Sequence, residues 1–396
     1  MLLLNRVKRD IQHHVKSLAT DIQAKRVVSL KPQERVRGNV LLSYILDPLP
    51  SYVAEKFFLR PQEVSNKHTN FWESRQIAKT FLELGYAVDV IPFWNQTFIP
   101  KKSYDVIIDS RHNLQRLAPD LKQDCLKIFH IDVANTLFNS TAEFNRLLAL
   151  QQRRGITLTP RRLELPNLGI DYADCATMIG NEFTRNTFKH ANKPIYPVPL
   201  PCAVRYAWSE AKDFENCRRR FLWFGSSALV HKGLDLVLEA FTEMPEYHLT
   251  VCGPIERETD FVAAFHQELY ETPNIQTVGW VNVESPEFRA ILDSSIACVY
   301  ASASEGQAGS VVTCMHAGLI PIISYECGVN VPEGAGISLP DCSIESIKKS
   351  VHKIANSPAL ELQEKARANW EYARANYTRE KYAEDYRNIV KTILKL

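Results

Sequence analysis

The sequence has no long apolar run, no strong excess of one charge and no paired-cysteine motif. No stretch approaches the roughly 20 apolar residues that a helix needs to cross a bilayer. The 47 basic and 45 acidic residues leave a net charge of +2, which gives no broad signal for nucleic-acid binding. The nine cysteines are scattered without a Cys-x-x-Cys pair, which argues against a structural zinc site and favours reduced thiols. We therefore expect a globular cytoplasmic protein.

Both halves of the chain alternate short apolar strands with helices, and no repeat of solenoid length is visible. A chain of 396 residues is too long for one compact core and suits two domains of roughly 150–200 residues each. Strands that alternate with helices at this spacing predict doubly wound parallel sheets. The sequence therefore predicts an α/β protein with two domains.

The N-terminal segment is basic. Between Arg6 and Arg37 there are nine Lys or Arg and three Asp or Glu, on a predicted helix from about Leu3 to Lys25. One interpretation is an amphipathic helix that rests on an anionic membrane surface at the inner membrane face. The alternative is a solvated helix packed on its own domain. The initial apolar run is too short for a secretory signal, and its charges follow it instead of preceding it.

The stretch 296–324 contains the first candidate site. It predicts a buried strand over 296–300, a polar loop, a helix over 310–317 and a second strand over 319–324. In open α/β sheets, ligands bind beyond the carboxyl ends of the strands, where a helix N-terminus offers free N–H groups to an anion. The polar loop places one acid, Glu305, at that edge. The alternative is a surface acid in an ordinary turn.

A second candidate loop follows the predicted strand 221–224. Its lysine, Lys232, lies between that strand and a helix predicted over 234–241. A lysine there can reach a phosphate, while Gly225, Ser226 and Ser227 offer N–H and hydroxyl donors. The alternative is a lysine exposed to solvent at the start of a helix.

Together these loops resemble the signatures of retaining glycosyltransferases of family 4, which have the GT-B fold. The family usually shows E-G-F-G followed by a second Glu eight residues after the first. Glu305-Gly306 match that pattern, but Thr313 stands at the second Glu. The family's other pattern is G-R-x-x-x-x-K-G. Here Lys232-Gly233 match, Ser226 replaces the Arg, and the loop has one residue more.

The resemblance covers about 221–324 and implies the GT-B arrangement of two Rossmann-like domains that face a central cleft. It implies an acceptor-binding domain over 37–200 after the basic segment 1–36, a nucleotide-sugar-binding domain over 201–376, and a last helix, 377–396, that crosses back. The implied reaction moves a hexose from a nucleoside diphosphate sugar to a glycan or lipid-linked acceptor, with retention. It implies no metal and no cofactor beyond that donor substrate.

By the same resemblance, Glu305 faces the donor sugar, and the donor diphosphate lies near the amides of Gly306, Gln307, Ala308, Gly309 and Ser310. Thr313 can hold a ribose hydroxyl without a charge. With one loop cation instead of two, we expect weaker diphosphate binding or another basic group in the missing position.

The first half matches the family in pattern more than in residues. His130 corresponds to the histidine that ends a strand near the reacting carbon in the family, although such a histidine can also be structural. His68, Thr69 and Asn70 replace the family's Gly-Gly turn and are expected on the acceptor side. Ser140 and Glu143 predict a capping box at the start of a helix.

Two rival functions remain open at this stage. Ser226, Thr313 and the missing Gly-Gly turn favour a GT-B protein that has weakened catalysis and serves as a binding or scaffolding partner. The other alternative is an isomerase or phosphorylase with the same two-domain fold.

Overall fold

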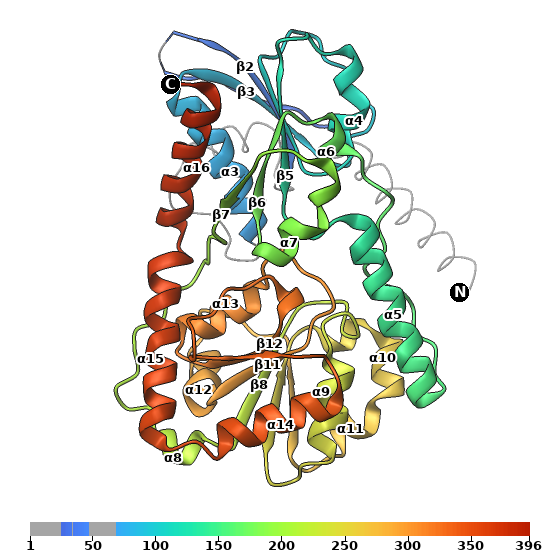
Figure 1. The fold of residues 1–396 in the computed structure, drawn as a ribbon, viewed down its shortest axis with the longest axis vertical. Coiled ribbons are helices and arrows are strands. Elements are labelled where there is room, and N and C mark those ends of the chain that lie inside the picture. The colour runs from blue at the N-terminus through green and yellow to red at the C-terminus, as the bar shows by residue number, and fades with distance from the viewer. Residues whose placement is uncertain (1–24, 34, 47–68) are drawn as a thin grey trace, which may run out of the picture.

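The computed structural model describes residues 25–33, 35–46 and 69–396. Within them the chain forms two lobes, each built on a largely parallel sheet with helices against it (Figure 1). The first sheet has the strand order β1-β3-β2-β4-β5-β6-β7, and the second has the order β10-β9-β8-β11-β12-β13. This arrangement confirms the predicted two-sheet α/β architecture.

The strands of the first lobe are short, apolar and buried, as expected for a sheet covered on both faces. They are β1 (Val28–Leu30), β2 (Gly38–Tyr44), β3 (Tyr86–Pro92), β4 (Val106–Asp109), β5 (Leu126–Ile131), β6 (Cys175–Ile179) and β7 (Ile195–Val198). All neighbouring pairs are parallel except β1 and β3. Part of the segment 1–36 is therefore an edge strand, not a helix. The predicted helix up to Lys25 lies almost entirely outside the described residues.

The helices of the first lobe are α3 (Thr69–Glu83), α4 (Asn113–Leu117), α5 (Thr136–Arg154), α6 (Gly169–Tyr172) and α7 (Glu182–Thr187). The predicted capping box at Ser140 is wrong. The helix α5 starts one turn earlier, where the Asn135 side chain accepts a hydrogen bond from the Leu137 N–H. It ends at Gly155, whose φ of 70° suits glycine.

The second lobe repeats the alternation of strands and helices. Its strands are β8 (Arg220–Phe224), β9 (His248–Cys252), β10 (Ile275–Gly279), β11 (Ala297–Tyr300), β12 (Ile320–Ser324) and β13 (Ile337–Leu339). Its helices are α8 (Phe214–Cys217), α9 (Leu234–Thr242), α10 (Thr259–Ala264), α11 (His266–Tyr270), α12 (Pro286–Ser294), α13 (Gly309–His316) and α14 (Ile344–Ala355). Short 3-10 turns in the chain lie at Ala118–Asp120, Lys189–Ala191, Ile255–Arg257 and Tyr325–Cys327.

Two long C-terminal helices join the lobes along one side of the molecule (Figure 1). The first, α15 (Ala359–Asn376), packs on α13 and α8 of the second lobe. The second, α16 (Arg379–Leu394), packs on α3 and β7 of the first lobe. Trp72 and Tyr382 meet edge to face at 5.5 Å between ring centres. The last helix therefore packs on the first lobe.

On the other side, α5 leaves the first lobe and runs down beside α10 of the second (Figure 1). Arg153 bonds Asp235 and Glu239 of α9, each at 2.8 Å. Arg154 bonds Glu268 of α11 at 2.5 Å. We call residues 136–165, which comprise α5 and the segment that returns along it, the strap. The strap is a second connection between the lobes, and the sequence did not reveal it.

In the described ranges, no helix combines the length and the apolar character that a membrane span requires.

Candidate active site

The cleft between the two lobes holds a cavity of about 780 Å³. It lies at the carboxyl ends of the strands of both sheets, where α/β proteins place their ligands. The second lobe contributes the predicted donor residues Gly225, Ser226, Ser227, Lys232, Glu305, Gly306, Gln307, Ala308, Gly309, Ser310 and Thr313. The first lobe contributes Thr69 and Asn70 at the start of α3, whereas His68 lies outside the described residues.

Lys232 and Glu305 meet in this cleft. The Lys232 ammonium donates to Glu305 Oε1, and both side chains are about nine-tenths buried. Lys232 is held at the start of α9 because Gly233 turns the chain there with a φ of 72°, a conformation that favours glycine. The two loops predicted separately from the sequence therefore bring together one charged pair that lines the cavity.

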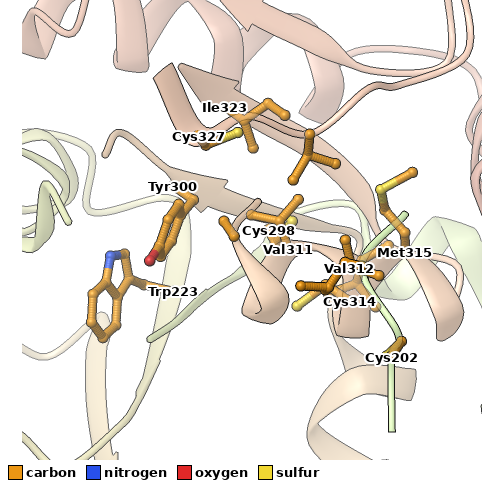
Figure 2. Packing of buried hydrophobic residues seen from close by; sticks show 14 of the residues in the cluster. Cys202, Trp223, Cys298, Tyr300, Val311, Val312, Cys314, Met315, Ile323 and Cys327 are labelled. Atoms are coloured by element: carbon orange, nitrogen blue, oxygen red, sulfur yellow. The ribbon is translucent and has the colours of Figure 1, made fainter. Parts of the chain in front are cut away.

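Aromatic packing from beneath fixes the position of Glu305. Tyr300, at the end of β11, donates its hydroxyl to Glu305 Oε1 at 3.2 Å. Its ring stacks on Trp223 of β8 at 6.2 Å between centres, and Figure 2 shows the two rings side by side. Since both rings are buried, the carboxylate rests on a rigid base.

Glu305 is ionised in spite of its burial. Burial alone opposes ionisation, but the positive charges of Lys232 and Arg162 outweigh it and lower the pKa of Glu305 to about 2. Burial lowers the pKa of Lys232, and the Glu305 carboxylate partly offsets that effect. The Glu305 carboxylate therefore lies in the cleft between two cationic side chains, Lys232 and Arg162.

The helix α13 opens into the cleft with no side chain capping its N-terminus at Ala308. An uncapped first turn leaves N–H groups available for an anion. The body of α13 is anchored by apolar contacts. Val311, Val312 and Met315 are buried, and they lie close to Cys298 of β11 in Figure 2.

Gly306 lines the cavity and also lies where the two lobes touch. A side chain at this position would collide with the backbone oxygens of Asp132 and Ile179, which belong to the first lobe. The Gly306 carbonyl also accepts a hydrogen bond from Thr184 at 3.3 Å. Glycine is required here because the backbones of the two lobes touch.

Thr313 lines the cavity, but its hydroxyl donates to Gly309 O within its own helix at 2.8 Å. The Cys202 thiol lies 3.8 Å from the Thr313 hydroxyl oxygen. Thr313 can therefore still accept a hydrogen bond from a ligand hydroxyl, although it brings no charge.

His130 does not line the cavity. It is 1% exposed at the end of β5, and its Nδ1 bonds Thr177 Oγ1 at 2.8 Å. Its ring packs edge to face against Tyr44 at 5.2 Å, and its Nε2 lies 3.9 Å from Glu73 Oε2. The predicted residue thus lies behind Glu73, which does face the cavity.

A charged network on the first-lobe wall escaped the sequence analysis. Arg111 Nη1 bonds Asp132 Oδ1 at 2.5 Å, and the Tyr44 hydroxyl donates to Glu73 Oε2 at 2.8 Å and to Asp132 Oδ2 at 3.2 Å. Burial disfavours the charge on Asp132, but Arg111 outweighs it and lowers the pKa of that carboxyl. The position of Arg111 and Asp132 in the sequence could have indicated this network, because each residue comes just after the end of a parallel strand.

The strap brings a further cation to the donor side. The Arg162 guanidinium reaches to 3.6 Å from Glu305 Oε2 and lines the cavity. Nearby, His231 Nδ1 bonds Glu143 of α5 and its Nε2 bonds the Ser304 carbonyl, both at 2.8 Å. Glu143, predicted as a cap, instead joins the strap to the loop that carries Lys232. Nothing in the local sequence around residue 162 indicates this role.

In the part of the chain that the structure describes, no three histidine, cysteine or acidic side chains come together in a way that could hold a metal ion.

These features define the class of fold. Two parallel-sheet lobes, a cleft at the carboxyl ends of their strands and a last helix that returns to the first lobe make this a GT-B fold, as predicted.

Residues 218–357 match the family model described as "Glycosyl transferases group 1". That match spans both loops that hold the charged pair, and it leaves the first lobe uncovered. No curated protein matches the sequence.

Solved structures match the whole molecule. Sucrose-phosphate synthase from Thermosynechococcus elongatus is 13% identical with a TM-score of 0.61, over 91% of this chain and 100% of that one. HepE of Anabaena, solved with UDP and glucose, is 12% identical with a TM-score of 0.52, over 91% and 100%. The N-terminal domain of trehalose-6-phosphate phosphatase from Candida albicans is 11% identical with a TM-score of 0.55, over 92% and 98%. At these identities the likeness concerns the fold.

Proposed function

We propose that this protein is a glycosyltransferase that moves a hexose from a nucleoside diphosphate sugar to a glycan or lipid-linked acceptor. The observation that carries the proposal is the buried Lys232–Glu305 pair that lines the cleft. The group 1 match over 218–357 supports it, and so does the fold shared with HepE, which was solved with UDP and glucose.

The donor would lie on the second lobe. Its diphosphate would face Lys232 and the uncapped N-terminus of α13, which offer fixed positive charge to the leaving group. The sugar ring would lie over Glu305, whose carboxylate accepts hydrogen bonds from ring hydroxyls. Thr313 would accept from a ribose hydroxyl.

The acceptor would lie against the first-lobe wall, where Thr69, Asn70 and Glu73 line the same cavity. With donor and acceptor on opposite walls, the acceptor hydroxyl would approach the sugar from the side of the leaving diphosphate. A departing phosphate oxygen could then take the proton from that hydroxyl, so the reaction retains the anomeric configuration. His130 would act only indirectly in this scheme, through Glu73.

No metal enters the proposal, because lysine, arginine and helix N–H groups on the chain can stabilise the departing diphosphate. Turnover should therefore continue in EDTA. A loss that added Mg²⁺ or Mn²⁺ restores would contradict this part of the proposal.

The test is nucleoside diphosphate release from a panel of UDP-, GDP- and ADP-sugars with candidate glycan acceptors. We expect one donor to be consumed, and Lys232→Ala to abolish its consumption. Lys381→Ala is the matched control, since that side chain pairs with Asp385 on the outer face of α16. Equal turnover in Lys232→Ala and the wild type would refute the assignment.

The rival with a specific observation behind it is a GT-B protein that binds a nucleotide without turnover. The exposed Ser226 and the uncharged Thr313 remove two charges that would hold the donor by the family's pattern. Binding of a nucleoside diphosphate by calorimetry, without consumption of any donor in the panel, would favour this rival. Release of a sugar phosphate that depends on inorganic phosphate would instead indicate a phosphorylase.

A further inference from the structure

Arg162 is placed where a second diphosphate cation is needed. It lies on the returning segment of the strap, and its guanidinium lines the donor side of the cavity. Its Nη2 approaches Glu305 Oε2 to 3.6 Å, which is longer than a direct charged hydrogen bond. Its Nε is buried and has no hydrogen-bond partner among the described residues. The side chain therefore brings a full charge and unused donors to the cleft.

Without Arg162, the donor side of the cleft has little net positive charge to face a diphosphate. The Lys232 ammonium is already paired with the Glu305 carboxylate, so these two side chains carry no net charge together. At position 226, where a second loop cation would face the cleft, the chain has an exposed serine. A nucleoside diphosphate carries at least two negative charges, and one neutralised lysine is a weak counterpart.

The backbone of Arg162 is fixed from several directions. Its carbonyl accepts from Asn139 Nδ2 at 2.8 Å, and the preceding N–H donates to Glu143 Oε1 at 2.7 Å. Glu143 in turn bonds His231, the neighbour of Lys232. Arg161 bonds Asp260 of the second lobe at 2.5 Å. Because the strap is bonded to the second lobe at these points, Arg162 is held at the donor site by the lobe that carries the other donor residues.

We propose that Arg162 is a catalytic residue that binds the donor diphosphate and supplies the second cation that position 226 lacks. This inference rests on the proposed function. In the reaction, the bond between the anomeric carbon and the diphosphate oxygen breaks, and its electron pair stays on the diphosphate. The acceptor oxygen forms the new bond to the anomeric carbon, and its proton passes to a departing phosphate oxygen. Lys232 and Arg162 then face the growing negative charge from two sides, one from the α9 loop and one from the strap.

The experiment compares Arg162→Ala, Ser226→Arg and the double variant. We expect Arg162→Ala to lower kcat/KM for the donor about 100-fold, which is typical for the loss of one group that stabilises a developing anion. Binding of the matching nucleoside diphosphate and of inorganic pyrophosphate should weaken in parallel. Ser226→Arg in the Arg162→Ala background should regain at least about 10-fold, because it returns a cation from the opposite side. Lys381→Ala, which removes a charge that pairs with Asp385 on α16 and does not line the cavity, should stay within about 2-fold of the wild type.

Each outcome decides a separate point. If the wild type consumes no donor and binds no diphosphate, the proposed function fails and this inference fails with it. If the wild type is active and Arg162→Ala matches it, only the assignment of Arg162 is overturned. If Arg162→Ala is impaired and Ser226→Arg restores nothing, the claim that the two positions share one role is wrong. Circular dichroism and melting temperature show whether each variant is folded.

Discussion

At the scale of single residues, the chemistry concentrates on a few charges that are almost fully buried. Glu305 is ionised there because positive charges lie against it, while burial lowers the pKa of Lys232 and that carboxylate partly offsets the effect. Removal of one partner from a buried pair leaves the other charge without compensation, whereas removal of both does not. The pair should therefore behave as a unit in stability measurements.

The first prediction concerns this unit. Glu305→Gln should lower the free energy of unfolding by about 3 kcal/mol, because the ammonium of Lys232 stays buried without its carboxylate. The double variant Lys232→Met/Glu305→Gln should regain most of that loss. Urea unfolding of the four proteins in the cycle measures the coupling. Additive losses would show that the two groups do not interact as their contact suggests.

The second prediction concerns His316, at the end of α13. It is fully buried and bonds the Tyr377 carbonyl through Nε2 at 2.9 Å. Burial lowers its pKa from the ordinary 6.5 to about 4. The unfolded chain therefore binds a proton between these values while the folded protein does not. The contribution of His316 to the free energy of unfolding is therefore fully present above about pH 6.5, and it is lost as the pH falls towards 4.

The shift in the pKa of His316 corresponds to a loss of about 3 kcal/mol in the free energy of unfolding at low pH. His316→Gln keeps an N–H donor for the Tyr377 carbonyl but does not titrate. The variant should show a smaller decline in the free energy of unfolding between pH 7 and pH 4, measured by urea titration at each pH. Parallel curves for the two proteins would contradict the assignment.

At the scale of elements, the strap is the feature that most changes how the site is understood. Its helix begins in the first lobe and ends among acids of the second, so the ion pairs of Arg153 and Arg154 act between lobes. Asp235, which bonds Arg153, is 1% exposed, so the pair lies in a partly desolvated interface. Such contacts are stronger than ion pairs on an open surface.

The third prediction compares an ion pair between the strap and the second lobe with an ion pair on the open surface. Arg153→Ala should lower the free energy of unfolding by about 2 kcal/mol, since the buried carboxylate of Asp235 loses a charged hydrogen bond. Lys79→Ala is the control. Its ammonium lies 3.7 Å from Glu83 within α3 and its side chain is 60% exposed, so its loss should cost no more than about 0.5 kcal/mol. Equal losses in both variants would show that the strap is no more tightly held than a surface pair.

At the scale of the whole molecule, two connections on opposite sides hold the lobes around the cleft, the strap on one and α16 on the other (Figure 1). The helix α16 buries Tyr382, Tyr386 and Val390 against the first lobe. These side chains close a surface of the first sheet that the first-lobe helices leave open. The last helix is therefore part of the first lobe's core although it lies at the other end of the chain.

The fourth prediction is a truncation. Removal of 378–396 should lower the unfolding temperature of the first lobe more than that of the second, because the burial of Trp72 and β7 under α16 is lost. Hydrogen exchange resolved by segment measures the effect in each lobe. Removal of Lys395 and Leu396 alone is the control and should have little effect, since both are exposed. Unchanged protection in β7 and α3 after the longer truncation would contradict the prediction.

The sequence alone determined the alternating α/β architecture and most core strands, since runs such as 40–44 and 297–300 are largely apolar and β-rich. It also identified Lys232 and Glu305, because each lies in a loop between a strand and a helix, where parallel sheets bind ligands. These features depend on local patterns of a few neighbouring residues.

Only the tertiary structure decided which distant residues meet. Arg162 reaches Glu305, and Glu143 bonds His231, through a helix that crosses from one lobe to the other. Gly306 is glycine because the first lobe's backbone touches it, and His130 lies behind Glu73 instead of in the cleft. The physical reason is common to all of them. Contacts between residues far apart in the chain depend on how the two lobes pack, and no local periodicity records that packing.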